Sequence, residues 1–356
     1  MKIIRLLLFP FAIIYGLISI LRNGFYNLGF FKSSKFSLPI INIGNLSVGG
    51  TGKTPHTEHL IRLLKNDYQL FTLSRGFGRK ERGFIIADDN SDAKQIGDEP
   101  LQYQKKYGNE IGVAVDANRV NGVLEICRHQ PETNLVLLDD AFQHRAIHAG
   151  LNILITAYNS PFYNDYLLPM GDLRERRVGA GRADIIIVSK CPDFDSIDKD
   201  AIINRIKPKA NQTVFFSKIN YGSCFHFSNG LNKSPEKVAE ISGKSIVLVT
   251  GIAQSEPLVA HLSKNNKIIK HFRFQDHYNF KEQDIHEIHN IIDKFVPDNP
   301  VIITTEKDAM RLMNDSFMPL LEKYNWIYQS IEIELDRPDK FNEIIKRYVE
   351  ENSRND

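Results

Sequence analysis

The sequence has few cysteines, little net charge and no low-complexity tract. Its three cysteines, at scattered positions, are too few for a disulfide framework or a C-x-x-C zinc site, so a reducing, cytosolic environment fits the bulk of the chain. A formal net charge of +2 argues against a general nucleic-acid binder, which normally carries a basic excess over a whole face. With 42% hydrophobic and 25% charged residues, the composition is that of a globular protein.

The first residues contain the longest apolar run. From Ile3 to Leu21 the chain reads IIRLLLFPFAIIYGLISIL, and a basic, aromatic stretch follows where a secretory signal would have a small-residue cleavage site. The run carries Arg5 and Pro10 and is short for a spanning helix of about 20 residues. A helix that spans the bilayer, one that lies in a single leaflet and one that packs on the protein's own core therefore all stay open. We favour membrane attachment.

Two series of β-type runs follow. The first is LPIINIG, LFTLSRG, IGVAVD, NLVLLDD, LNILITAY, ADIIIVSK and TVFFSKI. Most are separated by helix-sized intervals, which predicts a parallel sheet covered on both faces. A polar, glycine-bearing stretch then precedes KSIVLVTGIA, KIIKHFRF, PVIITTEKDA and NWIYQSIEIEL. Since single cores rarely exceed roughly 250 to 300 residues, we expect two α/β domains.

The stretch NIGNLSVGGTGKTPH, residues 42–56, nearly spells a phosphate-binding loop. Gly52, Lys53 and Thr54 match G-x-x-x-x-G-K-[ST], but Ser47 replaces the first glycine. A predicted strand precedes the loop and a helix-forming stretch follows it, which is the context that the motif requires. The residues expected to bind the ATP phosphates are Ser47, Val48, Gly49, Gly50, Thr51, Gly52, Lys53 and Thr54.

Carboxylates follow another predicted strand. NLVLLDD ends in Asp139 and Asp140, the form of a segment that holds Mg²⁺ beside a phosphate loop. Asp98 and Glu99, in GDEP, stand before a predicted helix, where a general base for a kinase or a simple helix N-cap would both fit.

Arginine-rich loops and an Asp-His pair complete the candidate residues. LPMGDLRERR and LSRGFGRK would suit an anionic acceptor, although surface charge is the ordinary explanation for such clusters. The pair Asp276-His277 in FQDHYNF is weak evidence on its own.

The combination of these blocks is specific. In order, NLSVGGTGKTP, LSRGFGR, GDEP, LLDDAFQH, LPMGDLRE, VSKCP, GIAQSEP, FQDHYNF and TTEKDAMR, behind an apolar N-terminus, resemble the tetraacyldisaccharide 4'-kinases, the lipid A 4'-kinases of Gram-negative bacteria. The resemblance covers nearly the whole chain. It implies ATP-dependent phosphorylation of the 4'-hydroxyl of a tetraacylated glucosamine disaccharide 1-phosphate, producing lipid IVA, at the cytoplasmic face of the inner membrane.

The resemblance also implies roles for individual residues. Asp98 and His277 match the family's catalytic dyad, Lys53, Asp139 and Asp140 complete the catalytic set, and Thr54 with Asp139 would ligate Mg²⁺. The blocks that resemble the acceptor-binding surface contribute Arg75, Arg119, Gln143, Arg174 and Glu175. Position 77 is Phe where the family pattern leads us to expect Tyr. The expected partners are the lipid acceptor and the membrane surface, without nucleic acid or an obligate protein partner.

The expected organisation is a P-loop NTPase-like parallel-sheet domain plus a second, smaller α/β domain, with an N-terminal membrane-associated helix. The divisions are an N-terminal hydrophobic segment (1–37), a P-loop kinase domain (38–219), a linker (220–240) and the second α/β domain (241–356). Two rival functions remain at this stage. A membrane-associated P-loop ATPase or GTPase acting on a protein explains the loop but not Asp98 or the arginines, and a nucleotide-regulated scaffold would have no chemistry.

Overall fold

The computed structural model describes residues 7–227, 236–238, 241–276, 278–295, 300–313 and 316–353. Within them, twelve strands form a sheet of order β10-β9-β11-β12-β8-β7-β6-β1-β5-β2-β4-β3. The strands of the first lobe are β1 (Ile40–Gly44), β2 (Leu70–Ser74), β3 (Ile85–Ile86), β4 (Gly112–Val115), β5 (Leu135–Asp139), β6 (Leu151–Ala157), β7 (Ile185–Ser189) and β8 (Thr213–His226). Those of the second lobe are β9 (Ser245–Thr250), β10 (Lys267–Arg273), β11 (Val301–Thr305) and β12 (Trp326–Leu335). Every predicted apolar run forms a strand, which confirms the α/β fold class.

Helices cover both faces of the first lobe's sheet. In β1, Ile41 packs with α3 on one face, whereas Ile40 packs with α6 on the other, because successive side chains of a strand alternate. The helices of this lobe are α2 (Phe9–Asn27), α3 (Lys53–Leu64), α4 (Ala93–Ile96), α5 (Asp98–Tyr107), α6 (Arg119–His129) and α7 (Lys199–Ile206), with 3₁₀ turns at Phe162–Asn164, Arg177–Arg182 and Phe194–Ser196. The second lobe has α8 (Glu256–Leu262), α9 (Glu282–Lys294), α10 (Glu306–Leu312) and α11 (Met318–Leu321), and α12 (Pro338–Asn352) ends the described chain.

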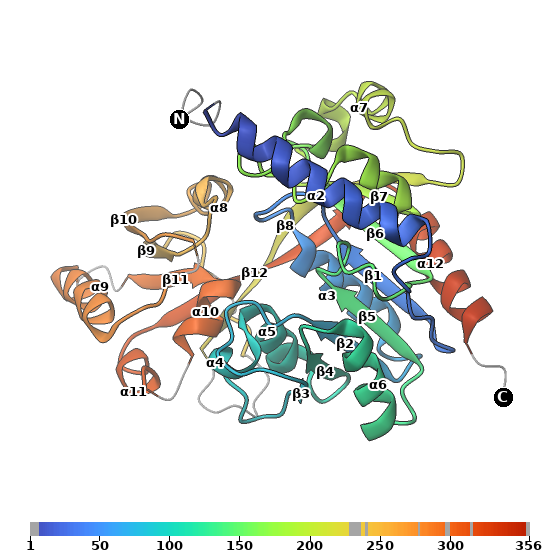
Figure 1. Cartoon of the computed structure of the whole chain (residues 1–356). Coiled ribbons are helices and arrows are strands. Elements are labelled where there is room, and N and C mark those ends of the chain that lie inside the picture. Colours follow the sequence, from blue (N-terminus) through green and yellow to red (C-terminus); the bar gives the residue numbers. More distant parts are fainter. Residues whose placement is uncertain are drawn as a thin grey trace.

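Two long strands join the lobes. The antiparallel pair of β8, from the first lobe, and β12, from the second, lies between the other strands of the two lobes, as Figure 1 shows. β8 runs to His226, so it passes through residue 220, where the predicted linker begins. After β12 the chain returns to the first lobe, because Phe341 and Ile345 of α12 are buried in that lobe's core. The division into two separately bounded domains stays a prediction.

The N-terminal helix α2 lies along one side of the first lobe (Figure 1). Its 19 residues are long and apolar enough to cross a membrane, and only 11% of its most apolar window is buried. Ala12 and Gly16 are its buried positions, while Phe11, Ile18 and Leu21 are each 61% exposed. The helix therefore packs on the first lobe through a narrow face and exposes the rest, and its attachment to a membrane stays a prediction.

Candidate functional site

The glycine-rich loop joins β1 to α3, and its backbone explains the missing first glycine. Ser47 forms an antiparallel bridge with Leu173, and the Val48 N–H donates to the carbonyl of Asp172 at 2.7 Å. Left-handed conformations appear only later in the loop, at Gly49 (φ 100°) and Gly52 (φ 89°). Because residue 47 does not need the conformational freedom of glycine, serine fits there without strain.

Hydrogen bonds from Asn45 and Ser189 hold the loop. Asn45 Nδ2 donates to Thr51 Oγ1 at 2.8 Å, and Ser189 Oγ, at the end of β7, donates to the Thr51 carbonyl at 2.6 Å. Lys53 is the first residue of α3, so the N-terminal N–H groups of a 12-residue helix face the loop. This arrangement attracts anions, phosphate in particular.

Asp140 forms ion pairs with two cationic side chains beside the loop. It follows β5, the strand that pairs directly with β1. Lys53 Nζ lies 3.8 Å from Asp140 Oδ2, and Arg174 grips both carboxylate oxygens at 2.6 and 3.1 Å. Although burial opposes the charge, Lys53 and Arg174 lower the pKa of Asp140 below its ordinary value. The carboxylate therefore stays ionised and orients two cations next to the phosphate cradle.

Asp139 is more deeply buried than Asp140. Tyr103 of α5 donates its hydroxyl to Asp139 Oδ2 at 3.0 Å, while Oδ1 is buried without a hydrogen-bond partner among the described residues. Burial, and then the charge of Asp140, raise the pKa of Asp139 to about 6. A buried carboxylate oxygen that lacks a donor suits a divalent cation, whose charge would offset the cost of burial.

Asp98 reaches across to the second lobe. It is the first residue of α5 and the N-cap position is Gly97, so Asp98 is not itself the N-cap residue. Instead, Arg311 Nε of α10 donates to Asp98 Oδ2 at 2.8 Å. His277, the predicted partner of Asp98, lies outside the described residues.

Four of the five predicted acceptor residues gather at the loop. Arg119, 3% exposed, donates to the Asp140 carbonyl at 3.2 Å, and burial lowers its pKa to about 10. Gln143 Nε2 donates to the Asn45 carbonyl at 2.7 Å and to Glu175 at 3.0 Å. Arg174 completes this group through its bond to the Asn45 side chain.

The fifth, Arg75, has an exposed side chain. Its charge still acts on the site, because it is one of the cations that lower the pKa of Arg119 and of His144. Burial and Arg119 are the larger causes for His144, whose pKa falls to about 4. His144 is therefore neutral at physiological pH. Phe77, at the position where Tyr was expected, is 71% exposed.

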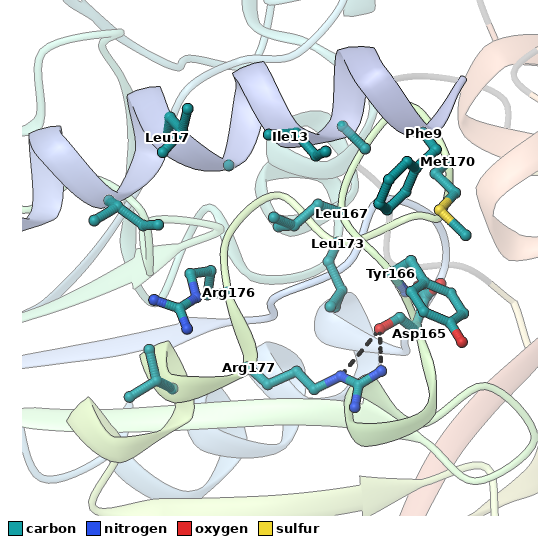
Figure 2. Close-up of a pocket in the computed structure, with 14 residues that line it drawn as sticks. Phe9, Ile13, Leu17, Asp165, Tyr166, Leu167, Met170, Leu173, Arg176 and Arg177 are labelled. Atoms are coloured by element: carbon teal, nitrogen blue, oxygen red, sulfur yellow. Dashed lines mark hydrogen bonds between the residues drawn. The ribbon is translucent and has the colours of Figure 1, made fainter. Parts of the chain in front are cut away.

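An apolar groove opens between α2 and the loop that carries Arg174. Its volume is about 460 Å³. Figure 2 shows Ile13 and Leu17 of α2 on one side and Leu167 and Leu173 on the other. At its rim, Arg177 donates twice to the carbonyl of Asp165.

The same helix is tied to the acceptor residues. Tyr15 of α2 donates its hydroxyl to the Arg174 carbonyl at 2.7 Å, and Asn23 Nδ2 donates to Glu175 at 3.3 Å. The groove and the charged site are therefore parts of one surface.

Sequence reasoning missed three residues that shape the site: Asn45, Tyr103 and Arg311. Asn45 is fully buried between the loop and Arg174. It stands inside the quoted loop, and Arg311 ends the quoted TTEKDAMR block, so both were visible as unassigned polar residues. Tyr103 carried no comparable signal.

A parallel sheet with a glycine-rich loop after β1 and paired aspartates after the neighbouring β5 defines a P-loop nucleotide-binding protein of the α/β class. The chain belongs to the tetraacyldisaccharide-1-P 4'-kinase family, LpxK, whose model matches residues 4–350. It is 42% identical to the tetraacyldisaccharide 4'-kinase of Flavobacterium johnsoniae, with 99% of each chain covered, and 45% identical to that of Flavobacterium psychrophilum, with 100% of each covered.

Among solved structures, LpxK from Aquifex aeolicus, crystallised in complex with ATP, is similar over 97% of this chain and 99% of its own, with a TM-score of 0.76 and 25% identity. The resemblance seen in the sequence is thereby confirmed. The chain is a tetraacyldisaccharide 4'-kinase, a phosphotransferase of lipid A biosynthesis, and the protein-directed ATPase or GTPase is the weaker interpretation.

Proposed function

We propose that the chain transfers the γ-phosphoryl group of ATP to the 4'-hydroxyl of tetraacyldisaccharide 1-phosphate at the site around Asp140, yielding lipid IVA. The observation that carries this proposal is the convergence of Lys53, Arg119 and Arg174 on Asp140 beside the phosphate loop. Phosphoryl transfer needs little covalent chemistry from the protein, and it depends on positioned cations that stabilise charge on the phosphoryl oxygens.

The nucleotide phosphates would lie on residues 47–54, with Lys53 contacting the β and γ oxygens. Thr54 and Asp139 would hold Mg²⁺, which neutralises charge on the phosphate oxygens when bound. Two observations support this assignment: Oδ1 of Asp139 is buried without a hydrogen-bond partner in the described part of the chain, and the pKa of that side chain is raised. Magnesium commonly takes one or two protein ligands and completes its shell with phosphate oxygens and water.

Asp98 would act as the general base that accepts the proton of the 4'-hydroxyl. Its place at the start of α5 supports this, because the same helix sends Tyr103 to Asp139. A general base contributes typically about a hundred- to ten-thousand-fold to the rate. The role of His277 as its dyad partner stays a sequence-based prediction.

The acceptor would lie along α2. One of its acyl chains would occupy the apolar groove between Ile13 and Leu167. The headgroup of the acceptor would be surrounded by the predicted acceptor residues, Arg75, Arg119, Gln143, Arg174 and Glu175. The exposed apolar residues of α2 would rest in the inner membrane at its cytoplasmic face, so that enzyme and lipid share one surface. This converts a search in solution into a local one.

The test uses radiolabelled ATP and tetraacyldisaccharide 1-phosphate in detergent micelles. Label in the lipid supports the kinase, and phosphate released without lipid supports an ATPase. If neither is observed, only the scaffold function remains. Asp98→Ala should lower turnover by about a hundredfold or more with unchanged ATP affinity. Asp195→Ala, at an exposed carboxylate outside the site, is the matched control. Full activity of Asp98→Ala would refute the assigned base.

A further inference from the structure

The TTEKDAMR block, residues 304–311, has no role in the proposed chemistry, yet its polar side chains meet α5. Thr305 caps α10 by accepting from the Asp308 N–H at 3.1 Å. Asp308 is fully buried, and it accepts from the Gly251 N–H at 2.8 Å and from the Thr305 hydroxyl at 2.7 Å. Burial raises the pKa of Asp308, against the effect of these donors. The block is therefore a rigid, internally bonded unit at the end of β11.

This unit holds the side chain of Arg311. Arg311 Nη1 lies 3.0 Å from Asp308 Oδ1 and 3.3 Å from the Gly251 carbonyl, and the side chain is 6% exposed. Its Nε then donates to Asp98 Oδ2 at 2.8 Å. Because a guanidinium is planar and its donors have fixed directions, two anchored contacts on Nη1 determine where Nε points.

The consequence falls on Asp98. Asp98 is the first residue of α5, directly after the N-cap Gly97, and Arg311 binds one of its carboxylate oxygens. An aspartate that accepts a proton from a hydroxyl must present one oxygen within hydrogen-bond reach of it.

We propose that Arg311 is a positioning residue for Asp98: it binds Oδ2 and thereby fixes the plane of the carboxylate that faces the acceptor. The inference rests on the proposed role of Asp98. Further contacts along α5 and α10 keep the two helices in register, since Lys106 Nζ lies 2.7 Å from Glu306 and Lys307 Nζ lies 3.7 Å from Glu99. A positioning residue differs from an ordinary ion pair between lobes, because its effect on the rate must act through Asp98.

The test is a double-mutant cycle in the micellar kinase assay. Arg311→Gln should lower kcat by about a hundredfold, the usual effect of misplacing a catalytic group, with KM for ATP unchanged. Arg311→Lys should recover part of this loss, since an ammonium group retains the charge but lacks the planar set of N–H donors of a guanidinium. Arg273→Gln is the control, because Arg273 belongs to the same lobe but pairs with Glu256 on the surface.

In an Asp98→Ala background, Arg311→Gln should cause no further loss of the residual activity. The same fold-loss in both backgrounds would overturn the inference and leave Arg311 as a structural ion pair. Melting curves accompany each variant, and if Arg311→Gln does not fold, Arg311→Lys carries the same cycle to the same two outcomes. Full activity of Asp98→Ala alone would instead refute the proposed base, so the two failures are distinguishable.

Discussion

The lysine that bridges three elements gives the sharpest stability prediction. Lys106 Nζ of α5 lies 2.6 Å from Glu58 Oε2 of α3 and 2.7 Å from Glu306 Oε1 of α10, and these two carboxylate side chains are 1% and 5% exposed. Although burial opposes its charge, the two carboxylates raise the pKa of Lys106. Lys106→Met keeps the length of the side chain but leaves two carboxylates without their shared cation. Deleting one partner of a buried pair costs about 3–5 kcal/mol.

The loss of stability caused by Lys106→Met should depend on pH. Burial, and then the charge of Glu58, raise the pKa of Glu306 from its ordinary value to about 7. The folded protein therefore binds this proton more tightly than the unfolded chain, and the associated stability is present at low pH and lost as the pH rises through about 7. Without Lys106, neutral Glu306 is easier to bury than its anion, so the destabilisation should be largest at pH 8 and smaller at pH 6.

The assay is urea unfolding followed by circular dichroism at both pH values. Lys218→Met is the matched control, because Lys218 also lies between two carboxylates, Asp193 at 3.6 Å and Glu334 at 3.2 Å, but on the surface. We expect a much smaller effect there, since exposed ion pairs contribute little. A Lys106→Met cost no larger than the control, or equal at the two pH values, would refute the reasoning.

Three further predictions concern the site. Ser47→Gly should leave ATP affinity unchanged in a binding titration, because residue 47 is in an extended bridge, and a marked gain would contradict this. Tyr103→Phe removes a donor to the Asp139 carboxylate, so the pKa of Asp139, about 6, should rise and the acid limb of the pH profile of kcat should move to higher pH. An unchanged pH profile would count against an ionised Asp139. Gly16→Val should raise KM for the lipid but not for ATP, because a Cβ at residue 16 would lie 2.9 Å from Leu167, which lines the groove. Ile18→Val, on the exposed face of α2, should change neither KM.

Local patterns predicted most of the secondary structure. The strands came from short β-branched runs, and the loop came from its glycines and its place before a helix, because both depend on residues close in sequence. The end of β8 was missed, since its last residues are polar and glycine-bearing and become strand only by pairing with β12. Cross-strand pairing of this kind depends on a partner about a hundred residues away, as in the bond from Gln329 to the Gly222 carbonyl across 107 positions.

The contacts that orient the site are also distant in sequence. Asp98 and Arg311 are 213 positions apart, and Gln143 reaches the Asn45 carbonyl across 98. The sequence predicted that Asp98, Asp139 and Lys53 belong to one site because they resemble a family's blocks. It could not show which arginine meets which carboxylate, because that depends on the order of strands in the sheet.

Helix α5 shows why such contacts matter for the chemistry. Asp98, Gln102 and Lys106 are spaced by four residues and so lie on one face, where they meet Arg311, Glu58 and Glu306. Tyr103, fully buried, turns from the same helix to Asp139. Each of these bonds satisfies a buried polar group, so a rotation or slide of the helix would leave several of them unpaired at once. The network therefore helps to hold α5 in position, and with it both Asp98 and Tyr103.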